Sequence, residues 1–409
     1  MYDLRLTPEQ LEFRDTVRDF VEAEIKPAAL HPDRLQPFEK PLMTDLLDKA
    51  AQMGLRTLAL SEEAGGAGAD GLTSCIVMEE LGAGDVDLAS VLGQTSALAH
   101  ILFDRLMTAE QKKRLLPKLV EDDRYHLAFA GRGAGDDAGW NYHRPMATAS
   151  GADPVAVKQG NDWVINGTLS FVANATVAKL FAVQARAGKG LTTLLVPRDT
   201  PGLAVREPLK AIGEGIRWHH GAGAGVTFKD CKVPADHLLG KEGASPFAQG
   251  ADAARGIPQI AAVNLGLGRA AYEAAVDYSK IRRQGGRNII EHQAIGGKLA
   301  DCAIRLELAR GMIWKAAWLL DHPEAVADRS ASDLPFHVIA RVYTAEAVNE
   351  VALLAAECFG AMGVMRDMPL QKYVHDSMVF LHTDDADGAA KLAVAEAVAG
   401  YTRPAADAA

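Results

Sequence analysis

The sequence has 409 residues, of which 48% are hydrophobic and 23% charged, a balance typical of a folded globular protein rather than a disordered one. Single cores stop growing at about 250–300 residues, so two or three packed regions are expected. A net charge of -10 disfavours nucleic acid, and no signal peptide or apolar run of about 18 residues is evident. We therefore expect a soluble, cytoplasmic protein with no nucleic-acid and no membrane partner.

Residues 1–123 are expected to form an N-terminal helical domain. Thr7, Pro8 and Gln10 have the spacing of a capping box with proline at the first helical position. Apolar residues then recur at helical spacing as far as Pro27. Further helical patterns cover residues 41–53, 72–81, 89–106 and 109–119.

The pattern changes to short β-type runs over residues 124–242, separated by Gly, Pro, Asn and Asp, which predicts a β-sandwich or barrel domain. Helical periodicity returns over residues 243–409, with helices expected at 336–359 and 386–399. A stripe in steps of three and four marks a helix of a four-helix bundle: Leu299, Cys302, Leu306, Ala309, Ile313, Ala316 and Leu320. The predicted fold class is therefore a multidomain α-β-α protein.

Several short motifs do not predict sites of their own. Gly266-x-Gly268-x-x-Ala271 matches a dinucleotide fingerprint, but it lies within a helical pattern and follows no strand. His219-His220 and His375-Asp376 lack further ligands at metal spacing, so hydrogen-bonded or surface histidines are expected and no metal site is predicted. The four cysteines are far apart and are expected to be buried, reduced thiols: Cys75, Cys231, Cys302 and Cys358.

Five segments, taken in order, resemble the acyl-CoA dehydrogenase superfamily of flavoproteins over nearly the full length. They are EEAGGAGADGLTSCIVMEELG from Glu62, GAGDDA from Gly133, DWVINGTLSFVANA from Asp162, VTFKDCKVPADHLLG from Val226 and YSKIRRQGGRNIIEHQAIGGKLADCAIRLELAR from Tyr278. The combination in this order is specific, whereas any one motif alone is weak. The resemblance implies FAD as the cofactor.

The resemblance also implies which positions hold the flavin. Arg282 stands where the family's arginine pairs with the cofactor pyrophosphate in a neighbouring subunit, and a guanidinium fork suits phosphate oxygens. Two hydroxyls expected beside the flavin are absent, and Glu357 is an unexpected acid near phosphates. The cofactor-binding positions implied are Ala130, Gly131, Gly133, Phe171, Val172, Ala173, Arg282, Gln284, His292, Gln293, Glu357, Gly360, Ala361, Ala386 and Gly388.

Asp384 falls where the family keeps its catalytic glutamate. That carboxylate removes the proton α to a thioester carbonyl while the β hydrogen leaves as hydride to flavin N5. A base acting near pH 7 needs burial to raise its pKa from about 4, and the apolar run 379–381 fits this need. From the residues alone, capping of a helix N-terminus is the favoured interpretation of Asp384, Asp385 and Asp387. The resemblance assigns Asp384 to catalysis and leaves the other two as caps.

Other positions leave the chemical class of the substrate undecided. Asp136 replaces a serine that contacts the CoA thioester in the family, and a carboxylate there would repel that anionic ligand. Asp252 and Arg255 retain the spacing of a substrate-binding pair, with a structural salt bridge as the alternative. An aspartate at the base position and a longer loop at WHHGAGAGVTF resemble the nitroalkane oxidase branch of the superfamily. That branch has an arginine seven residues after the base, where this sequence has Lys391.

Three functions follow from the resemblance. The leading expectation is an FAD-dependent acyl-CoA dehydrogenase, a homotetramer that passes electrons to an electron-transfer flavoprotein. The second is an oxidase of a nitroalkane or related small carbon acid. The third is a catalytically silent partner subunit, which the missing hydroxyls and Glu357 favour and which Arg282, Gln293 and Asp384 oppose.

Overall fold

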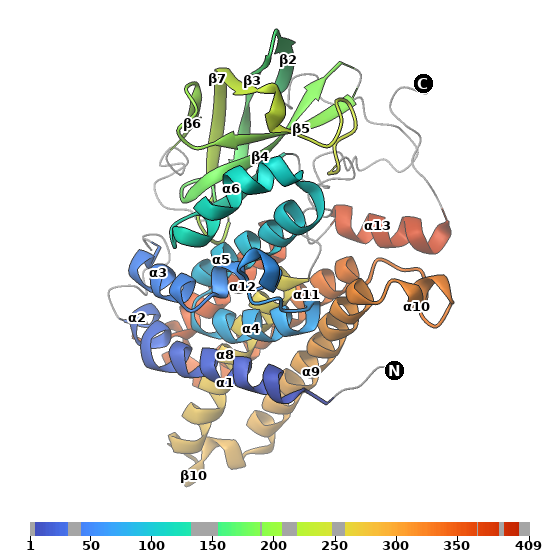
Figure 1. Ribbon diagram of the computed structural model, residues 1–409. Coiled ribbons are helices and arrows are strands. Elements are labelled where there is room, and N and C mark those ends of the chain that lie inside the picture. Colours follow the sequence, from blue (N-terminus) through green and yellow to red (C-terminus); the bar gives the residue numbers. More distant parts are fainter. Residues whose placement is uncertain are drawn as a thin grey trace.

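The computed structural model describes residues 5–31, 42–131, 154–188, 190–206, 219–247, 258–365, 367–383 and 388–400. Helices lie at both ends of the sequence and a sheet lies between them, so the predicted α-β-α order is confirmed. Figure 1 shows the sheet at one end of the molecule and the C-terminal helices at the other, with the N-terminal helices packed against both.

The N-terminal region is helical, as predicted. The capping box forms: Gln10 N donates to Thr7 Oγ1 (3.1 Å) and Thr7 N donates to Gln10 Oε1 (3.0 Å). The predicted helix over 89–106 is α-helical only to Ala99 and continues as a π-helix. The elements are α1 Pro8–Phe20, η1 Val21–Ile25, α2 Lys26–Ala29, α3 Thr44–Gln52, η3 Leu55–Thr57, η4 Glu62–Ala64, α4 Gly71–Gly84, α5 Val86–Ala99, η5 His100–Leu106 and α6 Ala109–Glu121.

The middle strands form one eight-stranded sheet in the order β6-β7-β3-β2-β4-β5-β8, and β1 pairs with β4 in parallel. The other long ladders, β3 with β7 and β4 with β5, are antiparallel. A β domain was expected here as a sandwich or barrel, and in the described residues its long strands form one hydrogen-bonded sheet. Its elements are β1 His126–Ala130, β2 Val155–Gln159, β3 Asp162–Val172, β4 Ala178–Ala187, β5 Gly190–Pro197, β6 Leu203–Val205, β7 Ala224–Pro234, η6 Ala235–His237 and β8 Leu238–Leu239.

The C-terminal region contains long antiparallel helices. In α9 the predicted stripe is buried from Leu299 to Ala316, while Leu320 is half-buried. The elements are α8 Gln259–Ile281, β9 Arg283–Gln284, β10 Arg287–Asn288, η7 Ile289–Glu291, α9 Gln293–Asp321, α10 Glu324–Ala327, α11 Phe336–Phe359, η8 Gly360–Val364, α12 Leu370–Thr383 and α13 Gly388–Ala399.

Three clusters of buried side chains hold these regions together. One cluster joins the N-terminal helices α1, α4 and α5 to α8, α9 and α11, so the two helical regions share a core. A second fills one face of the sheet, and a third packs α5, η5 and α6 onto β1, β4 and β5. The four cysteines are buried and free, as predicted.

Two stretches, 86–106 and 336–364, are long and apolar enough to cross a membrane by length and composition. The first is 89% buried inside the protein, so its apolar surface is used by the core. The second is 44% buried and packs against α8, α9 and α12.

Gly266 and Gly82 allow α8 and α4 to approach each other. A Cβ at Gly266 would lie 2.1 Å from the Glu79 carbonyl oxygen, and one at Gly82 would lie 2.2 Å from that of Val263. The glycine motif of α8 therefore serves helix packing, and no phosphate-binding turn forms there.

Replacing Gly266 by alanine is expected to destabilise the protein by about 3 kcal/mol, because backbone must move to admit the methyl group. Gly311→Ala on α9 is the matched control: nothing lies within 4 Å of its added methyl group, and a gain of up to about 1 kcal/mol is expected. Urea unfolding of both variants measures the difference. Equal stability of the two variants would refute the close approach.

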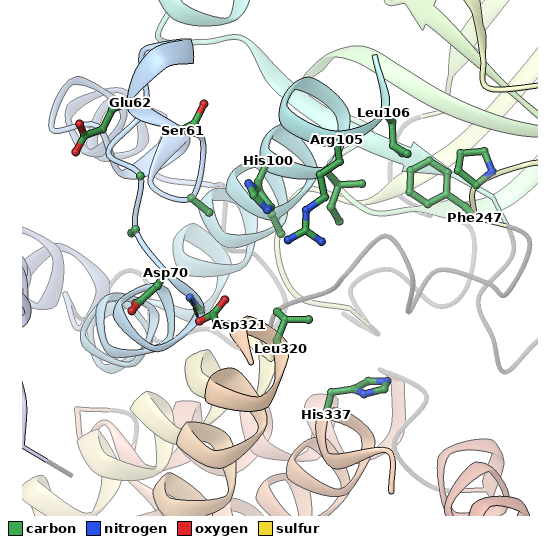
Figure 2. A pocket seen from close by; sticks show the side chains of 17 residues that line it. Ser61, Glu62, Asp70, His100, Arg105, Leu106, Phe247, Leu320, Asp321 and His337 are labelled. Atoms are coloured by element: carbon green, nitrogen blue, oxygen red, sulfur yellow. Dashed lines mark hydrogen bonds between the residues drawn. The ribbon is translucent and has the colours of Figure 1, made fainter. Parts of the chain in front are cut away.

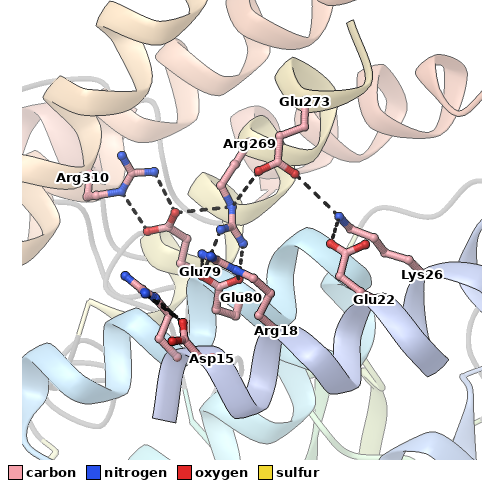
Figure 3. Close-up of polar contacts among 10 residues, drawn as sticks. Asp15, Arg18, Glu22, Lys26, Glu79, Glu80, Arg269, Glu273 and Arg310 are labelled. Carbon is pink, nitrogen blue, oxygen red and sulfur yellow. Dashed lines mark hydrogen bonds and ion pairs between the residues drawn. The ribbon is translucent and has the colours of Figure 1, made fainter. Parts of the chain in front are cut away.

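A network of buried and half-buried ion pairs ties α1, α4, α8 and α9 together (Figure 3). Glu80 accepts two hydrogen bonds from Arg18 (2.7 and 3.1 Å) and two from Arg269 (2.6 and 2.9 Å). The adjacent Glu79 accepts two from Arg310 (2.8 and 3.1 Å). Bidentate pairs fix both distance and orientation, so the network sets how the two helical regions meet.

Candidate functional site

Several predicted site residues lie outside the described residues: Gly133, Asp136, Asp252, Arg255, Asp384 and Ala386. Gly388 is described as the first residue of α13. The roles assigned to these positions stay predictions. The remaining predicted residues form two groups in the structure.

The first group lies at the ends of β1 and β3 in the sheet. Ala130 and Val172 are buried in the sheet core and support the strand ends from within. Gly131, Phe171 and Ala173 are half-buried and form the open part of this wall. Small or apolar side chains of this kind fit one face of a planar aromatic ring, so the residues present suit a flavin despite the missing hydroxyls.

Asn174 joins the two strand ends, a role that its motif in the sequence does not predict. It adopts φ 60° and is buried, and its Nδ2 donates to Val91 O (3.1 Å), Thr95 Oγ1 (3.2 Å) and Leu127 O (3.3 Å). Its Oδ1 is buried without a hydrogen-bond partner. The asparagine in FVANA, in a turn that needs left-handed backbone, was the available signal.

The second group gathers at one end of the bundle, where α8 ends, α9 begins and α11 ends. Tyr278 stacks on Phe359 with ring centroids 4.1 Å apart, and Lys298 pairs with Glu357. Gly360 has φ 58°, a conformation that favours glycine. The group is Arg282, Gln284, His292, Gln293, Glu357, Gly360 and Ala361, of which all but the half-buried His292 are exposed.

Glu357 is therefore less unfavourable for binding a phosphate than the sequence alone suggests. The Lys298 ammonium neutralises its carboxylate, and the hydrogen bond that Lys298 donates to Glu357 raises the pKa of Lys298. A phosphate near this end of α11 would meet an ion pair instead of a lone negative charge.

The two groups lie in different parts of the molecule. The first lies where the sheet meets the helices, because Asn174 beside it donates to Val91 O of α5. The second lies at the end of the bundle with the β9–β10 hairpin, which carries Gln284 and is at the bottom of Figure 1. Within one chain the length of α8, which begins beside Gly93 of α5 and ends at Ile281, separates the two groups.

A buried charged cluster, which the sequence does not predict, joins three regions. Lys372 Nζ lies 2.7 Å from Asp376 Oδ2 and 3.9 Å from Asp85 Oδ2. His220 Nε2 is 3.0 Å from the Asp376 carbonyl oxygen, and its Nδ1 is 3.5 Å from Asp87. Burial alone would lower the pKa of Lys372, but Asp376 and Asp85 raise it above its ordinary value.

This cluster fixes α12 against the start of α5 and the loop at 219–221. His220 also packs on Phe380 with ring centroids 4.2 Å apart, and the neighbouring His219 stacks on Phe171 at 3.6 Å. The expectation of hydrogen-bonded histidines is confirmed for His220. Within the described part of the sequence, no group of three potential metal ligands occurs.

A cavity of about 710 Å³ lies between the N-terminal helices, the segment after the sheet and the ends of α9 and α11 (Figure 2). Ala97, Ile101, Leu106, Phe247 and Leu320 supply its apolar lining. Phe247 packs on Phe129 of β1 at a centroid distance of 5.0 Å, which connects this lining to the strand that ends at the predicted flavin wall. The volume suits a small organic ligand.

Comparisons with known proteins assign nearly the whole sequence to one family. Family models match residues 7–123 (acyl-CoA dehydrogenase, N-terminal domain), 147–230 (middle domain) and 249–398 (C-terminal domain). The probable acyl-CoA dehydrogenase YngJ of Bacillus subtilis is 31% identical over 92% of this chain and 94% of its own length.

Solved structures give the same fold. Butyryl-CoA dehydrogenase from Megasphaera elsdenii is similar with a TM-score of 0.80 and 26% identity, covering 97% of this chain and 100% of that one. A chain from a structure described as the electron transferring flavoprotein of Acidaminococcus fermentans has a TM-score of 0.82 and 25% identity, covering 97% of this chain and 99% of that one.

Proposed function

The chain belongs to the acyl-CoA dehydrogenase family and is an FAD-dependent oxidoreductase, and we propose that it dehydrogenates an acyl thioester between the α and β carbons. The observation that carries the proposal is a carboxylate at position 384, where the resemblance places the family's base, in a chain similar to named acyl-CoA dehydrogenases over almost its full length.

Bound FAD supplies the hydride acceptor. In the proposed reaction Asp384 takes the proton α to the carbonyl, a step that needs a base shielded from water. Phe171, Ala173 and Gly131 would line one side of the bound flavin ring. The cluster around Lys372 and Asp376 holds α12 against the start of α5.

The separation of the two cofactor groups supports a shared site. The strand-end wall of one chain and the Arg282 end of another would together hold one FAD, which requires an oligomer; we propose a homotetramer. Exposed apolar residues on the bundle offer surface for that contact: Ile281, Ile304, Leu308, Leu353, Val364 and Met365.

An electron-transfer flavoprotein is the proposed acceptor of the electrons. The similar chain from the Acidaminococcus structure, whose description concerns electron transferring flavoprotein, supports this part. Cytoplasmic location remains part of the same proposal.

The proposal is tested by anaerobic reduction of the FAD-loaded protein. We expect a set of acyl-CoAs of increasing chain length to bleach the flavin absorbance and one or more to give the corresponding enoyl product. Failure of every thioester in the set to bleach the flavin refutes the proposed substrate class.

Oxidation of a nitroalkane is the second candidate, favoured by aspartate in place of glutamate at position 384 and by the WHHGAGAGVTF loop. Bleaching by nitroethane and by no thioester would establish it. A protein that binds no FAD would instead indicate the silent partner subunit.

A further inference from the structure

The cavity in Figure 2 has two polar ends that the proposed dehydrogenation does not use. His100 and Arg105 project together from η5 at one end. Asp70 and Asp321 lie beside each other at the other end, and Glu62 lies on the same loop as Asp70. Ala97, Ile101, Leu106, Phe247 and Leu320 supply the apolar part of the lining.

The π-helical form of η5 is what brings His100 and Arg105 together. In a regular α-helix, residues five positions apart point about 140° away from each other around the axis. A π-helical turn instead hydrogen-bonds residue i+5 to residue i, and such turns occur often at functional sites. Because η5 spans His100 to Leu106, both basic side chains face the cavity.

His100 is held in one orientation. Its Nδ1 lies 2.7 Å from Asp104 Oδ2, and Asp104 accepts hydrogen bonds from Ser61 Oγ (2.7 Å) and Ser61 N (3.1 Å). The Nε2 atom of the ring has no partner in the described part of the protein. With Nδ1 on the Asp104 carboxylate, Nε2 is the ring atom left for a ligand.

Arg105 adds a second donor. Its guanidinium makes no hydrogen bond or ion pair with the residues that the structure describes, and its planar fork matches a carboxylate or phosphate. Arg105 therefore supplies a forked donor suited to an anionic group, beside the polar edge of the His100 ring.

The opposite end suits a cation. Asp70 Oδ1 accepts from Thr73 N (2.7 Å) and Asp321 Oδ2 accepts from Gly71 N (2.8 Å), so each carboxylate is fixed by one oxygen at the start of α4. The second oxygen of each has no hydrogen bond among the described residues. An anion alone would be repelled by Glu62, Asp70 and Asp321, whereas a ligand with a positive group there would be attracted.

We propose that this cavity binds a small zwitterion with an apolar middle, whose carboxylate or phosphate pairs with Arg105 beside His100 and whose ammonium group faces Asp70 and Asp321. The inference rests on the cavity alone. It stands whether or not the protein oxidises acyl thioesters.

Isothermal titration calorimetry of the FAD-loaded protein with 6-aminohexanoate tests the proposal, with hexanoate and hexylamine as probes that each carry one of the two charges. We expect 6-aminohexanoate to bind more tightly than either. Arg105→Gln and Asp321→Asn should each raise its dissociation constant about tenfold or more, because each removes a charged partner. Lys113→Gln on α6, which removes a positive charge outside the cavity, should leave it unchanged.

The single-charge probes separate the two ends: Arg105→Gln should weaken hexanoate binding alone, and Asp321→Asn should weaken hexylamine binding alone. Absence of binding, or binding unaffected by Arg105→Gln or by Asp321→Asn, overturns the proposal. Binding of coenzyme A that depends on Arg105, without any binding of 6-aminohexanoate, also overturns it and assigns the basic end to the carrier of a thioester substrate.

Discussion

Asp384→Asn is expected to lower the rate of anaerobic flavin reduction by the best thioester about 10³-fold or more, while FAD remains bound. The amide keeps the size of the side chain but cannot accept the α proton, and a positioned general base contributes about 10²–10⁴ in rate. Stopped-flow absorbance of the flavin measures the effect, and the visible spectrum before mixing confirms that the cofactor is present.

Asp385→Asn is the matched control, because the neighbouring acid is expected only to cap the following helix and should reduce the same rate by no more than a few fold. Asp384→Glu supplies the carboxylate found in the family and should retain far more activity than the amide. If Asp384→Asn reduces the flavin as fast as the parent, the base lies elsewhere and the role of this residue is refuted.

Much of the fold could be predicted because its signals are local. The capping box at Thr7, the stripe of α9 and the helix 336–359 follow from periodicity and caps, and all of them are confirmed. The π-helical turn at His100 had no such signal: its residues continue the apolar pattern of α5, and only tertiary packing selects the wider turn.

The candidate site was predictable only where a motif carried it. The strand-end wall and the exposed end of the bundle were found through the family's motifs, but their separation along the molecule needed coordinates. The cluster of Lys372, Asp376 and Asp85 was missed because its members come from sequence positions almost 300 residues apart, and no spacing rule connects such residues.

Glu80→Ala is expected to lower the free energy of unfolding by about 3–5 kcal/mol, the largest stability effect predicted for this protein. Glu80 is only 3% exposed and receives four hydrogen bonds from Arg18 and Arg269, so its removal leaves two guanidinium groups without their carboxylate. Urea unfolding followed by far-ultraviolet circular dichroism measures the loss. Glu307→Ala provides the control: this side chain is 71% exposed, and a loss of no more than about 1 kcal/mol is expected.

The contribution of Glu80 to the free energy of unfolding should also depend on pH. Burial would raise the pKa of its carboxyl group, but the hydrogen bonds from Arg18 and Arg269 outweigh burial and lower it below the ordinary value of 4.5. A lowered pKa in the folded state means that the stabilisation is complete above pH 4.5 and is lost as the pH falls through the folded-state pKa. The difference in unfolding midpoint between the parent and Glu80→Gln should therefore shrink below pH 4.5.

The cost of Glu80→Ala should come from the stranded arginines rather than from the lost carboxylate itself. Without Glu80, Arg269 keeps only its longer contacts with Glu79 (3.6 Å) and Glu273 (3.9 Å). Adding Arg269→Met to Glu80→Ala should then cost less than Arg269→Met costs in the parent protein, because the double variant no longer buries a guanidinium that has lost its bidentate carboxylate. A double-mutant cycle by urea unfolding gives the coupling energy. Strict additivity of the two substitutions, or a loss for Glu80→Ala as small as for Glu307→Ala, would show that the network does not set the contact between α4 and α8.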